Sequence, residues 1–128
     1  VGKAFGVILV VVGEKNFEVA TFRSDGIYRD GRRPESVSFS NPKEDSARRD
    51  FTVNALFFDP MKNEVVDYHG GREDISLKLI RAVGDPEKRF EEDRLRLLRA
   101  IRFAAQLDFK IEDKTWSALR RQAGSVHV

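Results

Sequence analysis

The 128-residue sequence predicts an α+β fold in which strands and turns come first and helices follow. Up to about Val83, short β-branched and apolar runs alternate with clusters of Gly, Pro, Asn and Asp. From Gly84 onward, apolar residues recur at the spacing of amphipathic helices. We therefore expect two regions, 1–83 and 84–128, that meet at Gly84-Asp85-Pro86.

Strands dominate the prediction for the first region. A buried strand over residues 4–12 and a second strand over residues 17–22 flank a Gly-containing turn, so they form a hairpin. Residues 53–58 and 64–67 form another strand pair around a Pro-containing turn. A final strand is expected over residues 79–83.

A loop and two short helices connect these strands. Residues 24–34 are rich in Gly, Asp and Arg, which predicts a mobile surface loop. Asn41 followed by Pro42 is typical of a helix start, with a side-chain cap and a first-turn proline. Residues 72–77 are expected to form a second short helix after two glycines.

The second region reads as helical throughout. Asp85 is a predicted N-cap, and one long helix is expected over residues 92–107. Its apolar stripe consists of Leu97, Leu98, Ile101, Ala104 and Ala105. Residues 113–122 form a further predicted helix, which Gly124 ends.

Composition excludes several classes of protein. Charged residues make up 34% of the chain, and its longest apolar run, Val7–Val12, is too short to cross a bilayer. The absence of Cys excludes a disulfide framework and fits a reducing compartment. Only two histidines are present, so a multi-His zinc centre is not expected. The formal net charge of +2 is too small to indicate a polyanionic partner by itself.

Asp93 and Arg96 are the most informative pair in the sequence. On a continuous helix they share a face, and a solvated ion pair is the commoner explanation of that spacing. A second interpretation uses hydrogen-bond direction, because a carboxylate only accepts and a guanidinium only donates. Such a pair complements cytosine and adenine. It rejects uracil and guanine, each unpaired buried polar group costing about 1–3 kcal/mol.

Other polar residues are candidates for nucleotide contacts. Asp50 and Asn54 could bind both hydroxyls of a ribose, and Arg48 or Arg49 could reach phosphate, although a capped turn with solvated arginines explains the pattern equally well. Three further features are also explained either by a ligand contact or by ordinary solvation and packing. They are the cations Arg99 and Arg102, the acid Glu18 on a predicted half-buried strand, and the basic hinge at 84–90.

Six stretches, in this order, resemble the bacterial class II tRNA nucleotidyltransferase and poly(A) polymerase family, which includes the CCA-adding enzymes. They are VGKAFG, FEVATFRSDGIYRDGRRP, ARRDFTVNAL, DYHGGREDI, AVGDPEKRFEEDRLRLLRAIRFAAQL and KTWSALR, and they cover nearly the whole chain. The resemblance implies that 1–83 is part of a head, or palm, with a polymerase-β-like nucleotidyltransferase sheet. It implies that 84–128 begins a helical neck.

The resemblance also implies a reaction and site residues. It implies addition of C and A from CTP and ATP to the tRNA 3′ end without a nucleic-acid template. Asp93 and Arg96 match the residues that read the base. Those matched to ribose and phosphate are Arg49, Asp50 and Asn54, with Arg99 and Arg102 beside them. Gly84, Asp85 and Arg89 match the family's hinge between head and neck. Asp30, Arg32 and Arg33 lie in the stretch that matches its flexible loop.

The catalytic motif of the family has no counterpart in these residues. That motif is a D-x-D pair that holds Mg²⁺, and no Asp-x-Asp occurs in the 128 residues. We therefore expect a fragment of a cytoplasmic enzyme, with the aspartates upstream, tRNA-binding domains downstream and no membrane segment. On its own the fragment is expected to be inactive. Glu18 is a candidate auxiliary carboxylate.

Two alternatives stay open from the sequence. Poly(A) polymerases of the family typically carry two basic residues after an early Gly, then Leu and His. Here Ala4 follows Lys3, and Val7 and Leu9 stand in the later positions, which favours CCA addition over poly(A) or A-only addition. A non-catalytic RNA-binding module is the other alternative, and it predicts salt-sensitive binding with little base preference.

Overall fold

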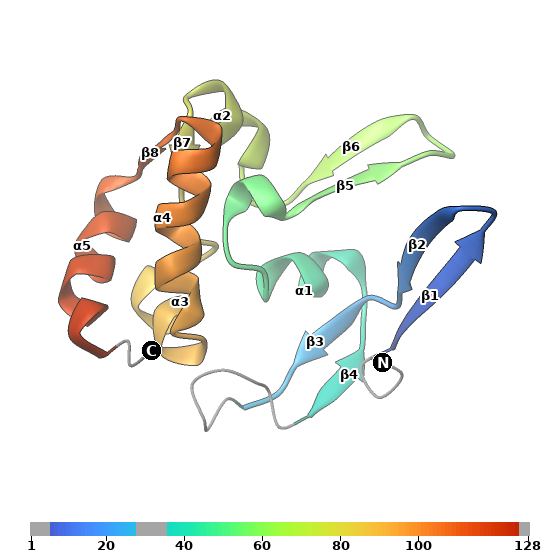
Figure 1. The fold of residues 1–128 in the computed structure, drawn as a ribbon, viewed down its shortest axis with the longest axis horizontal. Helices are drawn as coiled ribbons and strands as arrows, with labels where there is room; N and C mark the ends of the chain where they lie inside the picture. The colour runs from blue at the N-terminus through green and yellow to red at the C-terminus, as the bar shows by residue number, and fades with distance from the viewer. Residues whose placement is uncertain (1–5, 28–35, 126–128) are drawn as a thin grey trace.

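The computed structural model describes residues 6–27 and 36–125. Its strands are β1 (Val7–Val12), β2 (Lys15–Ala20), β3 (Arg23–Asp25), β4 (Val37–Phe39), β5 (Leu56–Asp59), β6 (Glu64–Asp67), β7 (Leu79–Ile80) and β8 (Lys110–Ile111). Its helices are α1 (Pro42–Ala47), α2 (Gly71–Ser76), α3 (Pro86–Glu92), α4 (Leu95–Leu107) and α5 (Asp113–Gln122), with 3-10 turns at Thr52–Asn54 and Ala123–Ser125. Helices α3, α4 and α5 gather on one side, and three hairpins extend from the other (Figure 1).

The strands pair in twos within the described part of the chain. β1–β2, β3–β4 and β5–β6 are antiparallel, and β7–β8 is parallel. β1 and β2 meet through a two-residue turn in which Gly13 has a φ of +61°, a conformation that favours glycine.

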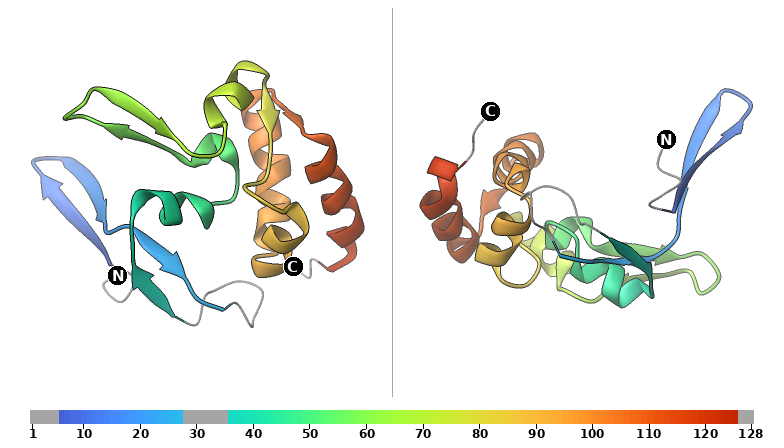
Figure 2. Two further views of the ribbon diagram at one scale, coloured as in Figure 1. Left: turned by 180° about the vertical axis from the view of Figure 1, so that it is seen from behind. Right: turned by 90° about the horizontal axis from the view of Figure 1, so that it is seen from below.

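The first predicted strand is wrong in its burial. Within the described residues the strand is β1, Val7–Val12, and its residues 8–12 are exposed, while the predicted positions 4 and 5 lie outside the described residues. The reason is that this hairpin stands away from the other elements, so neither of its faces is covered by a second layer (Figure 2). Glu18 on β2 is likewise exposed, not half-buried.

Tertiary pairing also changes the later strands. The predicted strand 53–58 starts with a 3-10 turn, and β5 begins only at Leu56. The predicted strand 79–83 is reduced to β7, because the chain then pairs with residues 50–52 instead: Thr52 N donates to Arg81 O at 2.9 Å. β7 is not the final strand, since β8 pairs beside it with Ile80 opposite Ile111.

The helix caps follow the sequence signals. Asn41 accepts a hydrogen bond from Glu44 N at 3.0 Å and begins α1, as predicted. Asp85 caps α3 in the same way. Helix α5 has the predicted bounds, and α2 starts one residue earlier than expected.

The long helix predicted over residues 92–107 is broken. α3 ends at Glu92 and α4 starts at Leu95, with Asp93 in an extended conformation at φ −145°. The cause is local, because the Asp93 carboxylate accepts from Leu95 N at 3.0 Å and so competes with the helical backbone pattern.

The hydrophobic core joins the two predicted regions. It is formed by Phe51, Ile80, Phe90, Leu97, Ala100, Ala118 and Leu119.

The α+β class is confirmed, and the boundary at Gly84 stays a prediction. The predicted loop 24–34 begins inside β3, and its residues 28–34 lie outside the described residues. Within the described ranges, no helix has the length and apolar character that crossing a bilayer requires.

Candidate functional site

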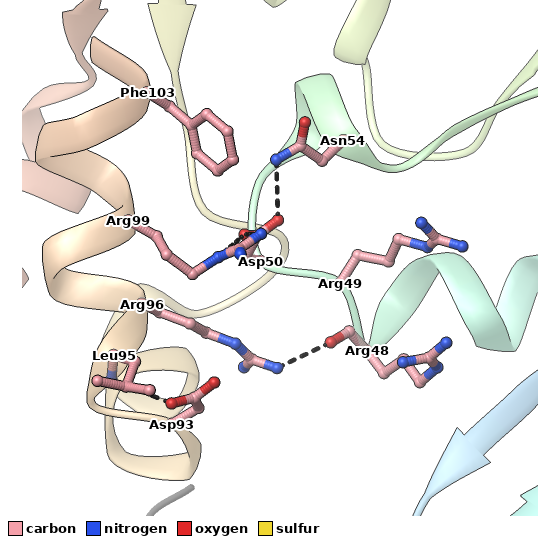
Figure 3. Close-up of a pocket in the computed structure, with 9 residues that line it drawn as sticks. All are labelled: Arg48, Arg49, Asp50, Asn54, Asp93, Leu95, Arg96, Arg99 and Phe103. Carbon is pink, nitrogen blue, oxygen red and sulfur yellow. Dashed lines mark hydrogen bonds and ion pairs between the residues drawn. The ribbon is translucent and has the colours of Figure 1, made fainter. Parts of the chain in front are cut away.

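An open pocket of about 580 Å³ lies between the N-terminal half of α4 and the segment that follows α1 (Figure 3). Its lining residues are Arg48, Arg49, Asp50, Asn54, Asp93, Leu95, Arg96, Arg99 and Phe103. The pocket therefore brings together most of the residues for which the sequence predicts base, ribose and phosphate contacts.

Asp93 and Arg96 both line this pocket, although they do not share one helix. Asp93 lies in the break before α4, and its Oδ1 accepts from Leu95 N. Its Oδ2 accepts no hydrogen bond from the described residues, so a ligand donor can reach it. The predicted shared helix face is thus wrong, but the predicted proximity holds.

The Arg96 guanidinium is fixed by the protein. The residue is only 7% exposed, and Nη1 donates to Glu92 Oε2 at 3.0 Å and to Arg89 O at 3.1 Å. Nη2 donates at 3.0 Å to Arg48 O, which lies on the opposite side of the pocket. A planar group held by several acceptors presents its donors in a set direction.

Asp50 is the second carboxylate of the pocket and is already bonded. Its Oδ1 accepts from Phe51 N at 2.8 Å and from Asn54 Nδ2 at 3.2 Å. Its Oδ2 accepts from Arg99 at 2.7 and 2.6 Å. The predicted ribose-binding pair, Asp50 and Asn54, is therefore a preformed unit, and Arg99 neutralises its charge.

Arg48 and Arg49 line the pocket, but both guanidinium groups bind Asp45 behind it. Arg49 donates to Asp45 Oδ1 at 2.9 Å and lies over the Phe57 ring, 5.2 Å from its centroid. Arg48 Nη2 donates to Asp45 Oδ2 at 2.9 Å. Figure 3 shows the Arg49 side chain turned away from Asp93 and Arg96.

These contacts keep Asp45 charged. Burial alone would raise the pKa of Asp45, since the residue is 2% exposed. The hydrogen bonds that its carboxylate accepts from Arg23 N, Arg48 and Arg49 outweigh burial and hold the pKa below its usual value. The carboxylate is therefore ionised at neutral pH.

Several predicted residues lie elsewhere. Glu18 and Arg102 do not line the pocket, and Arg102 lies over the Phe103 ring at 4.9 Å. Arg89 donates to Ala47 O at 2.9 Å, which fixes α3 against the end of α1. Gly84, whose φ is +71°, and Asp85 form the exposed entry to α3. The predicted loop residues Asp30, Arg32 and Arg33 lie outside the described residues.

Sequence reasoning missed the acids that hold the arginines. Asp45 precedes Arg48 and Arg49 by three and four residues, and Glu92 precedes Arg96 by four. That spacing is the ordinary signal of pairs on neighbouring helical turns, and it could have identified them. The Asp50–Arg99 pair spans 49 residues and has no local signal.

The described residues do not fit a Mg²⁺ site by themselves. Across residues 6–27 and 36–125, no three Asp, Glu or His side chains come together as a metal-ligand set.

Comparison with known proteins decides the family. A model of the poly(A) polymerase head domain matches residues 1–81. This chain belongs to that family. The match and the predicted resemblance agree, which confirms the expected partial nucleotidyltransferase fold.

Relatives are similar over almost the whole chain. The CCA-adding enzyme of Enterococcus faecalis (strain ATCC 700802 / V583) is 50% identical over 120 residues, which are 93% of this chain and 29% of that protein. The crystal structure of the Bacillus stearothermophilus CCA-adding enzyme in complex with CTP has a TM-score of 0.85 at 41% identity. It covers 97% of this chain and 29% of the other.

A tRNA nucleotidyltransferase complexed with a primer tRNA and an incoming ATP analog has a TM-score of 0.76 at 34% identity, and covers 94% of this chain and 33% of the other. The chain thus spans about three tenths of the length of the curated relatives that it matches.

Proposed function

We propose that the protein carrying this chain is a tRNA nucleotidyltransferase that adds C and A from CTP and ATP to the tRNA 3′ end. One observation supports it above the others. A carboxylate and a guanidinium, Asp93 and Arg96, line one pocket, and the guanidinium is held in place from two sides. The relatives in complex with CTP and with a primer tRNA are consistent with this ligand class.

Base choice follows from hydrogen-bond direction in this proposal. Asp93 Oδ2 accepts from the exocyclic amine of cytosine or adenine, and Arg96 donates to the adjacent ring nitrogen. Uracil and guanine place an acceptor opposite the carboxylate and a donor opposite the guanidinium. Each such mismatch leaves polar groups unpaired and costs about 1–3 kcal/mol.

The remaining pocket residues are suited to contact the ribose and the phosphates of the nucleotide. Asn54 and Asp50 lie on the side of the pocket away from Asp93, where they are suited to bind ribose hydroxyls. Arg99 is suited to donate hydrogen bonds to a phosphate, because its side chain is 42% exposed although it pairs with Asp50. We infer that ribose binding exchanges part of the Asp50–Asn54 contact for contacts to the ligand.

The same proposal covers cofactor and location. Mg²⁺ is the expected cofactor of this reaction class, with ligands supplied by carboxylates other than those in the pocket. The lack of cysteine fits a reducing compartment, so we propose a cytoplasmic enzyme.

Replacing Asp93 by Asn in the full-length protein tests base choice directly. Leu95 N holds Oδ1 of the carboxylate, so the substituted amide keeps that bond through its carbonyl oxygen and turns its NH₂ group toward the pocket. The acceptor thereby becomes a donor. The ratio of CTP to UTP affinity, measured by titration, should fall about tenfold or more, since one mismatched polar contact is worth about 1–3 kcal/mol.

Asp59→Asn is the matched control. Asp59 Oδ1 accepts from Met61 N at 2.9 Å, the same local geometry as at Asp93, but Asp59 does not line the pocket. This variant should keep the CTP preference. An Asp93→Asn variant with unchanged preference would contradict the proposal. Incorporation of ATP without CTP would instead identify an A-adding enzyme or a poly(A) polymerase.

A further inference from the structure

Asp45 is a buried carboxylate that lies behind the pocket without lining it. It is 2% exposed and belongs to α1. Oδ1 accepts two hydrogen bonds from Arg49, at 3.1 and 2.9 Å. Oδ2 accepts from Arg48 Nη2 at 2.9 Å and from Arg23 N at 3.0 Å. Both oxygens are thus occupied, and two of the partners are charged.

Arg48 connects this carboxylate to the base-reading arginine. Its side chain is fixed on one side by Asp45 and by the carbonyl of Arg23, to which its Nε donates at 3.1 Å. On the other side, the backbone carbonyl of Arg48 accepts from Arg96 Nη2 at 3.0 Å (Figure 3). Residue 48 therefore lies directly between Asp45 and Arg96.

The contact from Arg48 differs from the other contacts described for Arg96. Glu92 and Arg89 are four and seven residues away from Arg96, on the preceding helix. Arg48 is 48 residues away and approaches from the opposite wall of the pocket. Because three acceptors at separate points define a plane, movement of the Arg48 carbonyl would tilt the guanidinium.

We propose that Asp45 is a positioning residue for base selection, acting through the Arg48 carbonyl on the Arg96 guanidinium. This inference rests on the proposed nucleotidyltransferase function. Asp45 touches no base in it. Its carboxylate anchors Arg48, and the anchored peptide sets the angle at which Arg96 presents its donors. A small error in that angle weakens the contact with the correct base and relaxes rejection of the wrong one.

The test compares two buried carboxylates in the full-length protein. Asp45→Asn removes the charge and one acceptor atom. Asp74→Asn makes the same change at a residue that is also 2% exposed, and that accepts from Arg81 and Thr52 outside the pocket. Both variants should lose thermal stability. Only Asp45→Asn should lower the ratio of CTP to UTP affinity, by about tenfold, the scale of one charged hydrogen bond.

A double-mutant cycle shows whether Asp45 acts through Arg96. Arg96→Lys keeps the charge but loses the planar fork, so it lowers the CTP preference by itself. In that background Asp45→Asn should lower the preference no further, because the group that it positions is gone. An equal, additive loss in both backgrounds would overturn the proposal, as would an unchanged preference in Asp45→Asn or an equal loss in Asp74→Asn.

A second variant covers the case in which Asp45→Asn does not fold. Arg48→Lys keeps a cation beside Asp45 but cannot reproduce the fork that binds Asp45 and the Arg23 carbonyl together. It should lower the CTP preference, and full retention would overturn the positioning role. Failure of the proposed function is distinguishable, since the wild-type protein itself would then show no preference for CTP over UTP.

Discussion

The imidazole of His69 is half-buried against α1, where its Nε2 lies 2.9 Å from Ser46 Oγ. The Ser46 hydroxyl donates to Lys43 O at 2.6 Å, so its oxygen is placed to accept a hydrogen bond from the Nε2–H group of His69. Burial lowers the pKa of His69 below its ordinary value of 6.5, although the nearby Asp67 carboxylate acts in the opposite direction. The folded protein therefore favours the neutral ring.

A pH dependence of stability follows for this residue. The unfolded chain binds a proton at His69 more readily, so stability present above about pH 6.5 is lost as the pH falls toward the lowered folded pKa. The midpoint of thermal unfolding should drop between about pH 7.5 and about pH 5.5, and His69→Gln should flatten that drop. His127→Gln, which removes the second histidine, is the control. Identical pH profiles for wild type and His69→Gln would contradict this assignment.

Residue-level roles were predictable only where they depend on residue type. Acceptor and donor identity at Asp93 and Arg96 follows from the side chains, and the residue types of Asp50 and Asn54 predict a ribose-binding pair, which the resemblance then matches. The Arg99 contact to Asp50 could not be predicted, because it joins residues 49 positions apart. The outward turn of Arg49 likewise depends on Asp45, which no motif had singled out.

Among the elements, the six-residue helix α1 supports two separate parts of the structure. It carries Asp45 and Ser46, and Arg48 is its C-cap residue, so it supports both the pocket wall and the His69 contact. A helix this short has little stability of its own and depends on its cap and its packing. Asn41 supplies that cap through the hydrogen bond from Glu44 N.

Asn41→Ala should loosen α1 without changing the pocket residues. Loss of an N-cap costs about 1 kcal/mol, so amide exchange over α1 should be about fivefold faster when measured by mass spectrometry. Lys43→Ala, at an exposed position of the same helix, should leave exchange nearly unchanged. Equal protection of α1 in Asn41→Ala and wild type would show that packing alone holds the helix.

Elements with local signals were predicted well, and those that depend on tertiary contacts were not. The start of α1 and both ends of α5 follow from caps and periodicity. β8 has two residues and exists because Lys110 N reaches Lys78 O at 2.8 Å, which no pattern within residues 108–112 reveals. The break at Asp93 was not predicted, because the apolar periodicity indicates a continuous helix and does not reveal the hydrogen bond from Leu95 N to the Asp93 carboxylate.

At the scale of the whole molecule, the pocket and the core both result from packing of the strand-rich region against the helical region. Phe51 and Ile80 from the strand-rich region pack with Phe90 and Leu97 from the helical region. This packing sets α4 beside the segment after α1, and the pocket is the space that remains at their junction. The position of Asp93 relative to Asp50 is therefore a property of the complete core.

In the proposed function, Asp93 and Arg96 take the place of a complementary base. A crystal structure of the full-length protein with CTP tests it most directly. The cytosine amine should lie within hydrogen-bond distance of Asp93 Oδ2, and the ring nitrogen should accept from the Arg96 guanidinium. A cytosine bound away from these two side chains, with Asp93 facing solvent, would contradict it.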